Sequence, residues 1–167
     1  MGMDAGADLV FGVDCGVEEG PWTDEEFAED IEDMGDLEEG LLKQAGLVSP
    51  HDTIPQEIRE GSYDEYRKWC DSNEEFKAAN EKFRAEANTI MDACPFEIVS
   101  YGSMEWASYI VFVKGFQISG DWDSPRKVDP ERFGMPDEAT LQRCAEYAKE
   151  HGIKWGEPAW LISASWG

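Results

Sequence analysis

Basic side chains are scarce in this sequence. It has 14 Lys and Arg residues against 37 Asp and Glu residues, which gives a formal net charge of −23. A surface of this sign repels the phosphates of nucleic acids and of anionic membranes, and it attracts basic proteins and cations. The composition therefore predicts no direct contact with nucleic acid or membrane and favours a basic protein as the partner.

The sequence also lacks the spacing patterns of metal sites and disulfide frameworks. The cysteines form no C-x-x-C pair and are accompanied by two histidines: Cys15, Cys70, Cys94, Cys144, His51 and His151. Structural zinc sites need closely spaced Cys and His ligands, so we expect no metal. The N-terminus has no positively charged, apolar leader, and no hydrophobic run approaches the length of a membrane span. We expect a cytoplasmic protein with reduced thiols.

Enzyme signatures are missing as well. The chain contains neither a phosphate-binding glycine loop nor a nucleophile elbow. A segment that begins like a calcium loop, Asp121-Trp122-Asp123, continues with Ser124-Pro125 and breaks the pattern. We therefore predict a protein without catalytic residues, cofactor or metal. A small enzyme is the alternative if folding joins His51 or His151 to a carboxylate or a cysteine.

The chain has enough apolar material for a folded core. Its 167 residues are 41% hydrophobic and 12% aromatic, which is typical of a folded domain of ordinary size rather than of a disordered chain. We expect one domain over residues 1–167, with a strongly acidic part at 1–46, a helical part at 62–94 and a strand-rich part at 96–167.

Local patterns predict both helices and strands. Short β-branched and aromatic runs predict four strands, at 9–13, 96–101, 108–113 and 159–166, and residues 116–119 either extend or follow the third. Capping boxes beginning at Ser62 and Ser72 predict helices within 62–94, and a further helix is expected at 137–151 with Gly152 as its stop. Runs of helices and strands favour an α+β fold, with helices packed on a mostly antiparallel sheet of about four strands.

The acids are concentrated in the N-terminal quarter. Residues 1–42 hold 15 acidic residues and no Lys or Arg. Thr23 and Glu26 fit a capping box, and Trp22 and Phe27 are placed as in a hydrophobic staple. Apolar residues then continue at helical spacing, so we predict an acidic helix that starts at Thr23. Two internal glycines leave open two shorter helices instead.

The carboxylates of this helix are the candidate partner-binding residues: Asp24, Glu25, Glu26, Glu29, Asp30, Glu32, Asp33 and Asp36. A helix rises about 1.5 Å per residue, so the first seven give roughly one charge per 2 Å of axis. Duplex DNA presents one phosphate per about 1.7 Å, and a groove lined with Lys and Arg would meet a similar field. The alternative is an ordinary solvated face, but such faces normally interleave Lys with Glu.

Several segments of the chain are shared with known sequences. MGMDAGADLVFGV at the start, SMEWASYIVFVKG and SGDWDSPRKVD in the second half, and GEPAWLISASWG at the end resemble a loose group of small, mostly uncharacterised tailed-bacteriophage proteins. The resemblance covers about half of the chain and implies a phage protein made in the cytoplasm of a bacterial host. The group supplies no catalytic residues to transfer, and its members are not all this acidic.

Charge and resemblance together predict an acidic phage inhibitor. It would bind a basic nucleic-acid-binding host protein, such as a nuclease or a defence effector, by imitating nucleic acid, as in anti-restriction or anti-CRISPR inhibition. One alternative is an immunity-type protein that neutralises a toxin, and another is an accessory or structural protein of a phage.

Overall fold

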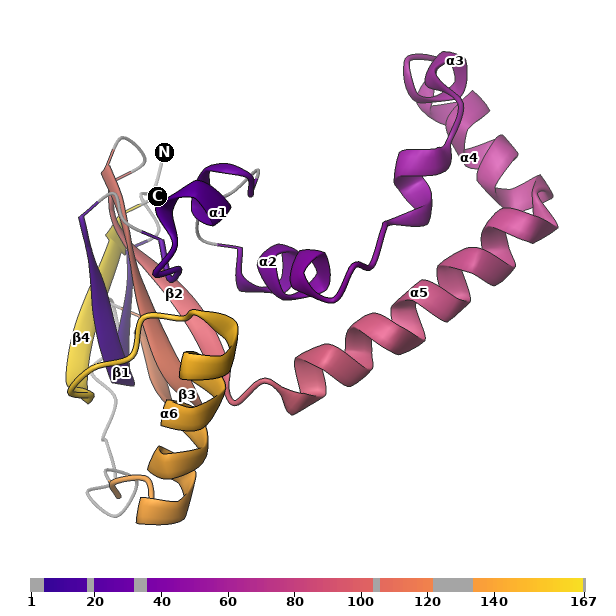
Figure 1. The fold of residues 1–167 in the computed structure, drawn as a ribbon. Helices are drawn as coiled ribbons and strands as arrows, with labels where there is room; N and C mark the ends of the chain where they lie inside the picture. Colours follow the sequence, from indigo (N-terminus) through magenta and orange to yellow (C-terminus); the bar gives the residue numbers. More distant parts are fainter. Residues whose placement is uncertain (1–4, 18–19, 32–35, 104–105, 122–133, 167) are drawn as a thin grey trace. The chain divides into compact units, whose positions relative to one another are not determined.

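The computed structural model describes residues 5–17, 20–31, 36–103, 106–121 and 134–166 (Figure 1). Within the expected domain of residues 1–167, contacts define two compact units. The sheet unit comprises residues 1–37 and 94–167, and the helical unit comprises residues 38–93. None of the helices in the described ranges has the length and apolar character needed to cross a bilayer.

Four strands build the sheet unit: β1 (Ala5–Val17), β2 (Phe96–Ser103), β3 (Trp106–Asp121) and β4 (Ala159–Trp166). They lie in the order β4, β1, β3, β2, and each of these neighbouring pairs is antiparallel. Every predicted strand is present, and residues 116–119 belong to the third strand, β3. The prediction of an α+β fold with a mostly antiparallel sheet of four strands is confirmed.

The sheet curls until its two outer strands meet. One parallel pair, Gly102 with Ser165, joins β2 to β4 and closes the sheet. β1 has register shifts between Val10 and Gly12 and again further along the strand, and such bulges bend a strand and increase its twist. A Cβ at Gly12 would collide with the backbone of β3, so glycine permits the close approach of these two strands.

The inner face of the curled sheet carries an apolar cluster. Val10, Ile110 and Phe112, which lie on the two middle strands, are buried. Each such side chain contributes about 1.5–3 kcal/mol when it leaves water. The partly buried side chains that pack against this cluster come from the outer strands: Val99 and Tyr101 on β2 and Leu161 on β4.

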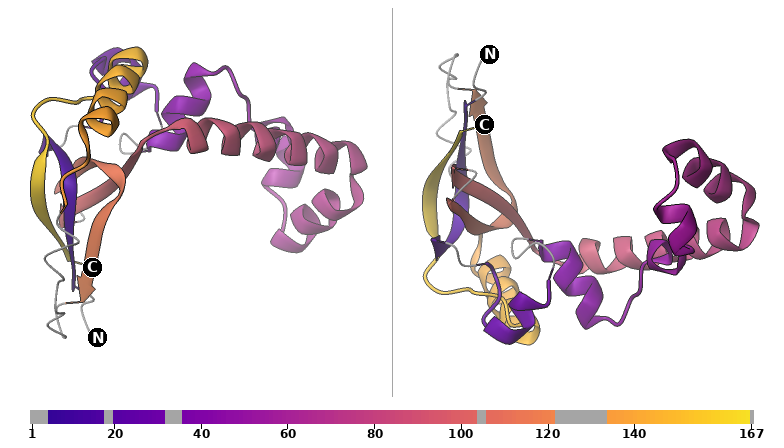
Figure 2. Two further views of the ribbon diagram at one scale, coloured as in Figure 1. Left: turned by 90° about the horizontal axis from the view of Figure 1, so that it is seen from below. Right: turned by 90° about the horizontal axis from the view of Figure 1, so that it is seen from above.

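The outer face is covered in part by α6 (Glu138–His151), which lies beside the sheet in two views (Figures 1 and 2). Cys144 and Ala148 of α6 are buried. Phe96 of β2 contacts the ring of Tyr147 at a centroid distance of 6.2 Å and the ring of Trp155 at 4.8 Å. Aromatic contacts of this kind fix the helix against the sheet.

Both ends of α6 follow the sequence prediction. The carboxylate of Asp137 accepts a hydrogen bond from the Thr140 amide at 2.7 Å. Hydrogen bonding with the side chain of Thr140, and then with this amide, lowers the pKa of Asp137. Gly152 ends the helix with a φ of +65°, in the left-handed region that glycine adopts without strain. The expected helix with Gly152 as its stop is therefore confirmed.

The helical unit contains α2 (Leu37–Gln44), which begins at its boundary, a 3₁₀ turn (Pro50–Thr53), α3 (Gln56–Arg59), α4 (Tyr63–Ser72) and α5 (Glu74–Ala93). Ser62 and Glu65 form the predicted capping box at the start of α4, and the bonds to Ser62 lower the pKa of Glu65. The box predicted for Ser72 and Glu75 is wrong. Asn73 caps α5 instead, accepting from the Phe76 amide at 3.0 Å, because Ser72 still belongs to α4 and Asn73 has the extended dihedrals of a cap.

Candidate protein-binding surface

The acidic segment forms one short helix, α1 (Glu25–Glu29), rather than the long helix expected from Thr23. The helix ends at Asp30, and α2 begins separately at Leu37. The continuous helix is therefore wrong, and the alternative of two shorter helices holds. Glu25 and Glu29 are like charges four residues apart, which destabilises a helix, and no base in residues 1–42 offsets their repulsion.

The start of α1 also differs from the prediction. Asp24, not Thr23, is the cap, and its side chain accepts a hydrogen bond from the Phe27 amide at 3.2 Å. The predicted box of Thr23 and Glu26 is therefore wrong. The expected contact between Trp22 and Phe27 is present, with ring centroids 5.2 Å apart and an interplanar angle of 78°.

Thr23 anchors α1 to the end of α6. Its backbone amide and its hydroxyl both donate to the carbonyl oxygen of Gly152, at 2.8 and 2.9 Å. The amide of Lys154 donates to the carbonyl oxygen of Pro21 at 2.6 Å. These three bonds fix the chain immediately before the first acidic residue of the helix.

The anchor is buried as well as hydrogen-bonded. Trp22 and Ile153 form an antiparallel bridge across it, and both side chains are 3% exposed. The indole Nε1–H of Trp22 has no hydrogen-bond acceptor among the described residues. Packing of the indole therefore has to outweigh a desolvation cost of about 1–3 kcal/mol, which identifies Trp22 as a strong apolar contact.

Sequence reasoning missed this anchor. Thr23 and Gly152 are 129 residues apart, and no periodicity or capping rule connects such positions. Gly152 was recognisable only as the stop of a helix. The available signal was local: a Trp before the acidic run, next to a glycine and a proline, predicts a packed entry to the helix but not its partner.

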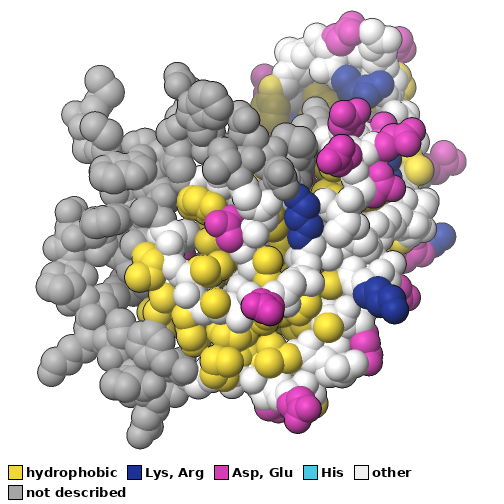
Figure 3. Space-filling model, turned by 60° about the vertical axis from the view of Figure 1, so that its left-hand side comes forward, with side chains coloured by type: hydrophobic (Ala, Val, Ile, Leu, Met, Phe, Trp, Pro, Cys, Tyr) yellow, Lys and Arg dark blue, Asp and Glu magenta, His cyan; other side chains and the backbone are white. Residues whose placement is uncertain are grey.

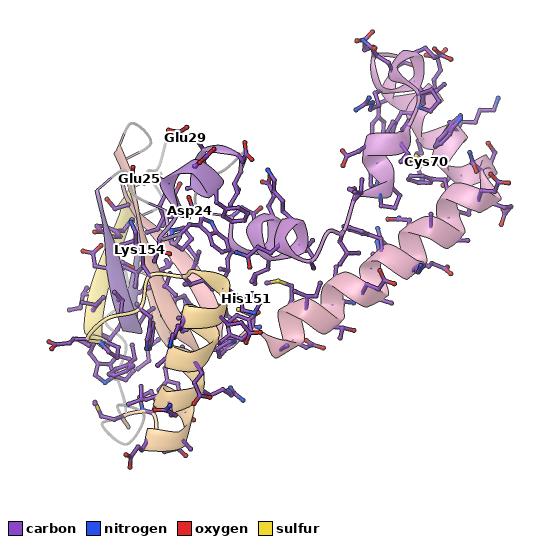
Figure 4. All side chains as sticks on the ribbon, viewed as in Figure 1. Asp24, Glu25, Glu29, Cys70, His151 and Lys154 are labelled. Atoms are coloured by element: carbon purple, nitrogen blue, oxygen red, sulfur yellow. The ribbon has the colours of Figure 1, made fainter. Side chains whose placement is uncertain are left out.

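The carboxylates around α1 are exposed. Side chains of Asp24, Glu25, Glu26, Glu29 and Asp30 all face solvent, and Figure 4 shows three of them at α1 and its start. Asp36 is also exposed. Glu32 and Asp33 lie outside the described residues. The structure therefore brings together five of the eight predicted residues on one ordered turn.

Four of these acids share one side of the helix. At about 100° per residue, Glu25, Glu26, Glu29 and Asp30 fall within an arc of roughly 140°. Phe27 and Ala28 fall on the opposite side and are half-buried. The charges are therefore gathered on the solvent side, although α1 is too short to give the extended row expected from the sequence. We call Asp24, Glu25, Glu26, Glu29 and Asp30 the acidic turn.

The helical unit shows what an ordinary charged face of this chain looks like. Its acids alternate with bases and form ion pairs along the helices: Arg67 with Asp71 at 3.8 Å, Lys77 with Glu74 at 2.8 Å and Lys82 with Glu86 at 3.8 Å. Such pairs support a helix by a few tenths of a kcal/mol. The acidic turn lies in a stretch without any base, so its carboxylates depart from the pattern used elsewhere in the same chain.

Two other clusters join a histidine, a tyrosine and a cysteine. In the sheet unit the rings of His151 and Tyr147 lie 4.2 Å apart, and Tyr147 is hydrogen-bonded to Cys94. Burial raises the pKa of the Cys94 and Cys144 thiols. Both thiols therefore stay protonated at neutral pH, the form in which cysteine is a poor nucleophile and metal ligand.

The helical unit holds the second cluster. The Nδ1 atom of His51 lies 2.7 Å from the hydroxyl of Tyr66, and the side chain of Tyr66 interacts with that of Cys70 one turn further along α4. The rings of Trp69 and Phe76 complete the cluster. No three His, Cys, Asp or Glu side chains of the described segments are arranged to hold a metal ion.

Comparison of the chain with protein-family models, curated proteins and solved structures finds no match. The resemblance to tailed-phage proteins therefore stays a prediction. Function has to be inferred from the geometry and charge of the acidic turn and its anchor.

Proposed function

We propose that this protein is an acidic inhibitor, of the kind made by phages, that binds a basic nucleic-acid-binding host protein. The acidic turn would occupy a groove whose Lys and Arg side chains otherwise neutralise phosphates, and the inhibitor would compete with nucleic acid for that groove. No chemical step is needed, because charge complementarity provides both attraction and partner choice.

One observation carries the proposal: five exposed carboxylates stand on a turn held in place by hydrogen bonds to Gly152 and Lys154. A preorganised surface loses little conformational entropy on binding. Residues 1–42 contain no Lys or Arg, so these acids are not interleaved with bases along the chain as the acids of the helical unit are. Fixed geometry and a local excess of exposed carboxylates together support a binding surface over a merely solvated one.

The size of the electrostatic contribution can be bounded. An exposed charge pair at an interface is worth about 0.2–1 kcal/mol. Five such pairs give roughly 1–5 kcal/mol, which corresponds to between about fivefold and a few thousandfold in affinity. Because the Debye length falls from about 10 Å at 0.1 M to about 3 Å at 1 M ionic strength, most of this contribution should disappear over that range.

The test is affinity capture of partners from a bacterial lysate at low and at high salt, followed by measurement of affinity and association rate. In the test variant, Asp24 and Asp30 become Asn, and Glu25, Glu26 and Glu29 become Gln; an asparagine in place of Asp24 still caps a helix. The control variant removes five exposed acids of the helical unit, with the same change in net charge: Glu57, Asp64, Glu75, Glu81 and Asp92.

We expect the test variant to lose the nucleic-acid-binding partner and the control variant to keep it. Equal binding by both variants, or an affinity independent of salt, would overturn the proposal. Capture of one toxin that is neutralised without salt-sensitive competition by nucleic acid would favour the immunity-type alternative instead. Detection of the protein in purified virions, without a captured partner, would favour a phage structural role.

A further inference from the structure

We draw no further inference here: the strongest candidate, the partly exposed apolar patch on the outer face of the sheet where Ile162 of β4 lies beside Leu9 of β1 and Leu9 beside Ile118 of β3 (Figure 3), carries none, because nothing in the described part of the structure shows what covers it.

Discussion

Gly152→Ala tests whether the anchor positions the acidic turn. Gly152 has a φ of +65°, and a Cβ there would lie 3.3 Å from the Thr23 hydroxyl that bonds its carbonyl. A non-glycine residue in the left-handed region costs about 1–2 kcal/mol. Alanine also lowers the conformational entropy of the unfolded chain, which offsets roughly 0.4–1 kcal/mol of this cost. The expected net loss is up to about 1.5 kcal/mol before any contact with Thr23 is counted.

Gly46→Ala is the matched control. Gly46 follows α2 with a φ of +68°, and a Cβ there would meet nothing within 4 Å. Both variants therefore carry the same cost of placing alanine at a positive φ. Only in Gly152→Ala does the new Cβ crowd the Thr23 hydroxyl of the anchor. Urea denaturation should give a lower midpoint for Gly152→Ala than for Gly46→Ala at similar slope, and only Gly152→Ala should weaken partner binding, although neither variant changes a charge.

Equal midpoints for the two variants would show that the Thr23 side chain moves aside without loss of stability, and that the anchor makes no measurable contribution to the free energy of unfolding. A destabilised Gly152→Ala protein that binds its partner with unchanged affinity would be a different result. It would mean that the order of the acidic turn is irrelevant and that charge alone determines binding.

Two further predictions concern the sheet unit. Gly12→Ala should be destabilising by about 1–3 kcal/mol, because the new Cβ would lie 2.7 Å from a backbone atom of β3; Gly156→Ala, with open space around it, should be neutral or slightly stabilising in the same urea titration. Alkylation followed by mass spectrometry should label the partly exposed Cys70 well before the buried Cys94 and Cys144. Since the folded pKa of the two buried thiols is raised, unfolding should become easier as pH rises above about 8.5, and a stability that increases there would contradict the burial of these thiols.

Local patterns predicted most elements of this fold. The strands at 96–101, 108–113 and 159–166, the capping box at Ser62 and the helix that ends at Gly152 all depend on residues within a few positions of one another. Patterns of this kind are encoded in propensity and in side-chain period, which are read without tertiary contacts. They were sufficient to predict an α+β fold.

The two wrong caps have a shared cause. Thr23 and Asp24 can both cap a helix, as can Ser72 and Asn73, so neighbouring residues compete for one role. The residue that becomes the cap is determined by its backbone dihedrals. In the first case it also depends on Thr23, whose hydroxyl already donates a hydrogen bond to the carbonyl oxygen of Gly152. Long-range contacts decide such choices, so a sequence window cannot.

The candidate site was found from composition, but its shape was not. Counting charges identified Asp24 to Asp30, whereas the length of α1 and the sharing of one helix side by four acids required the structure. Closure of the sheet through Gly102 and Ser165 was equally hidden, because these two residues lie far apart in the chain and no local pattern connects them.

The anchor at Gly152 has a consequence for synthesis on the ribosome. Residues 21–23 emerge early, but the carbonyl and amide that hold them belong to residues 152 and 154. Throughout most of translation the acidic helix has no scaffold, while the helical unit, contiguous over residues 38–93, can fold from neighbouring turns. A chain that stops short of Gly152 would therefore carry all the charge of the N-terminal quarter without a fixed arrangement of it, and prematurely released fragments should be poor binders.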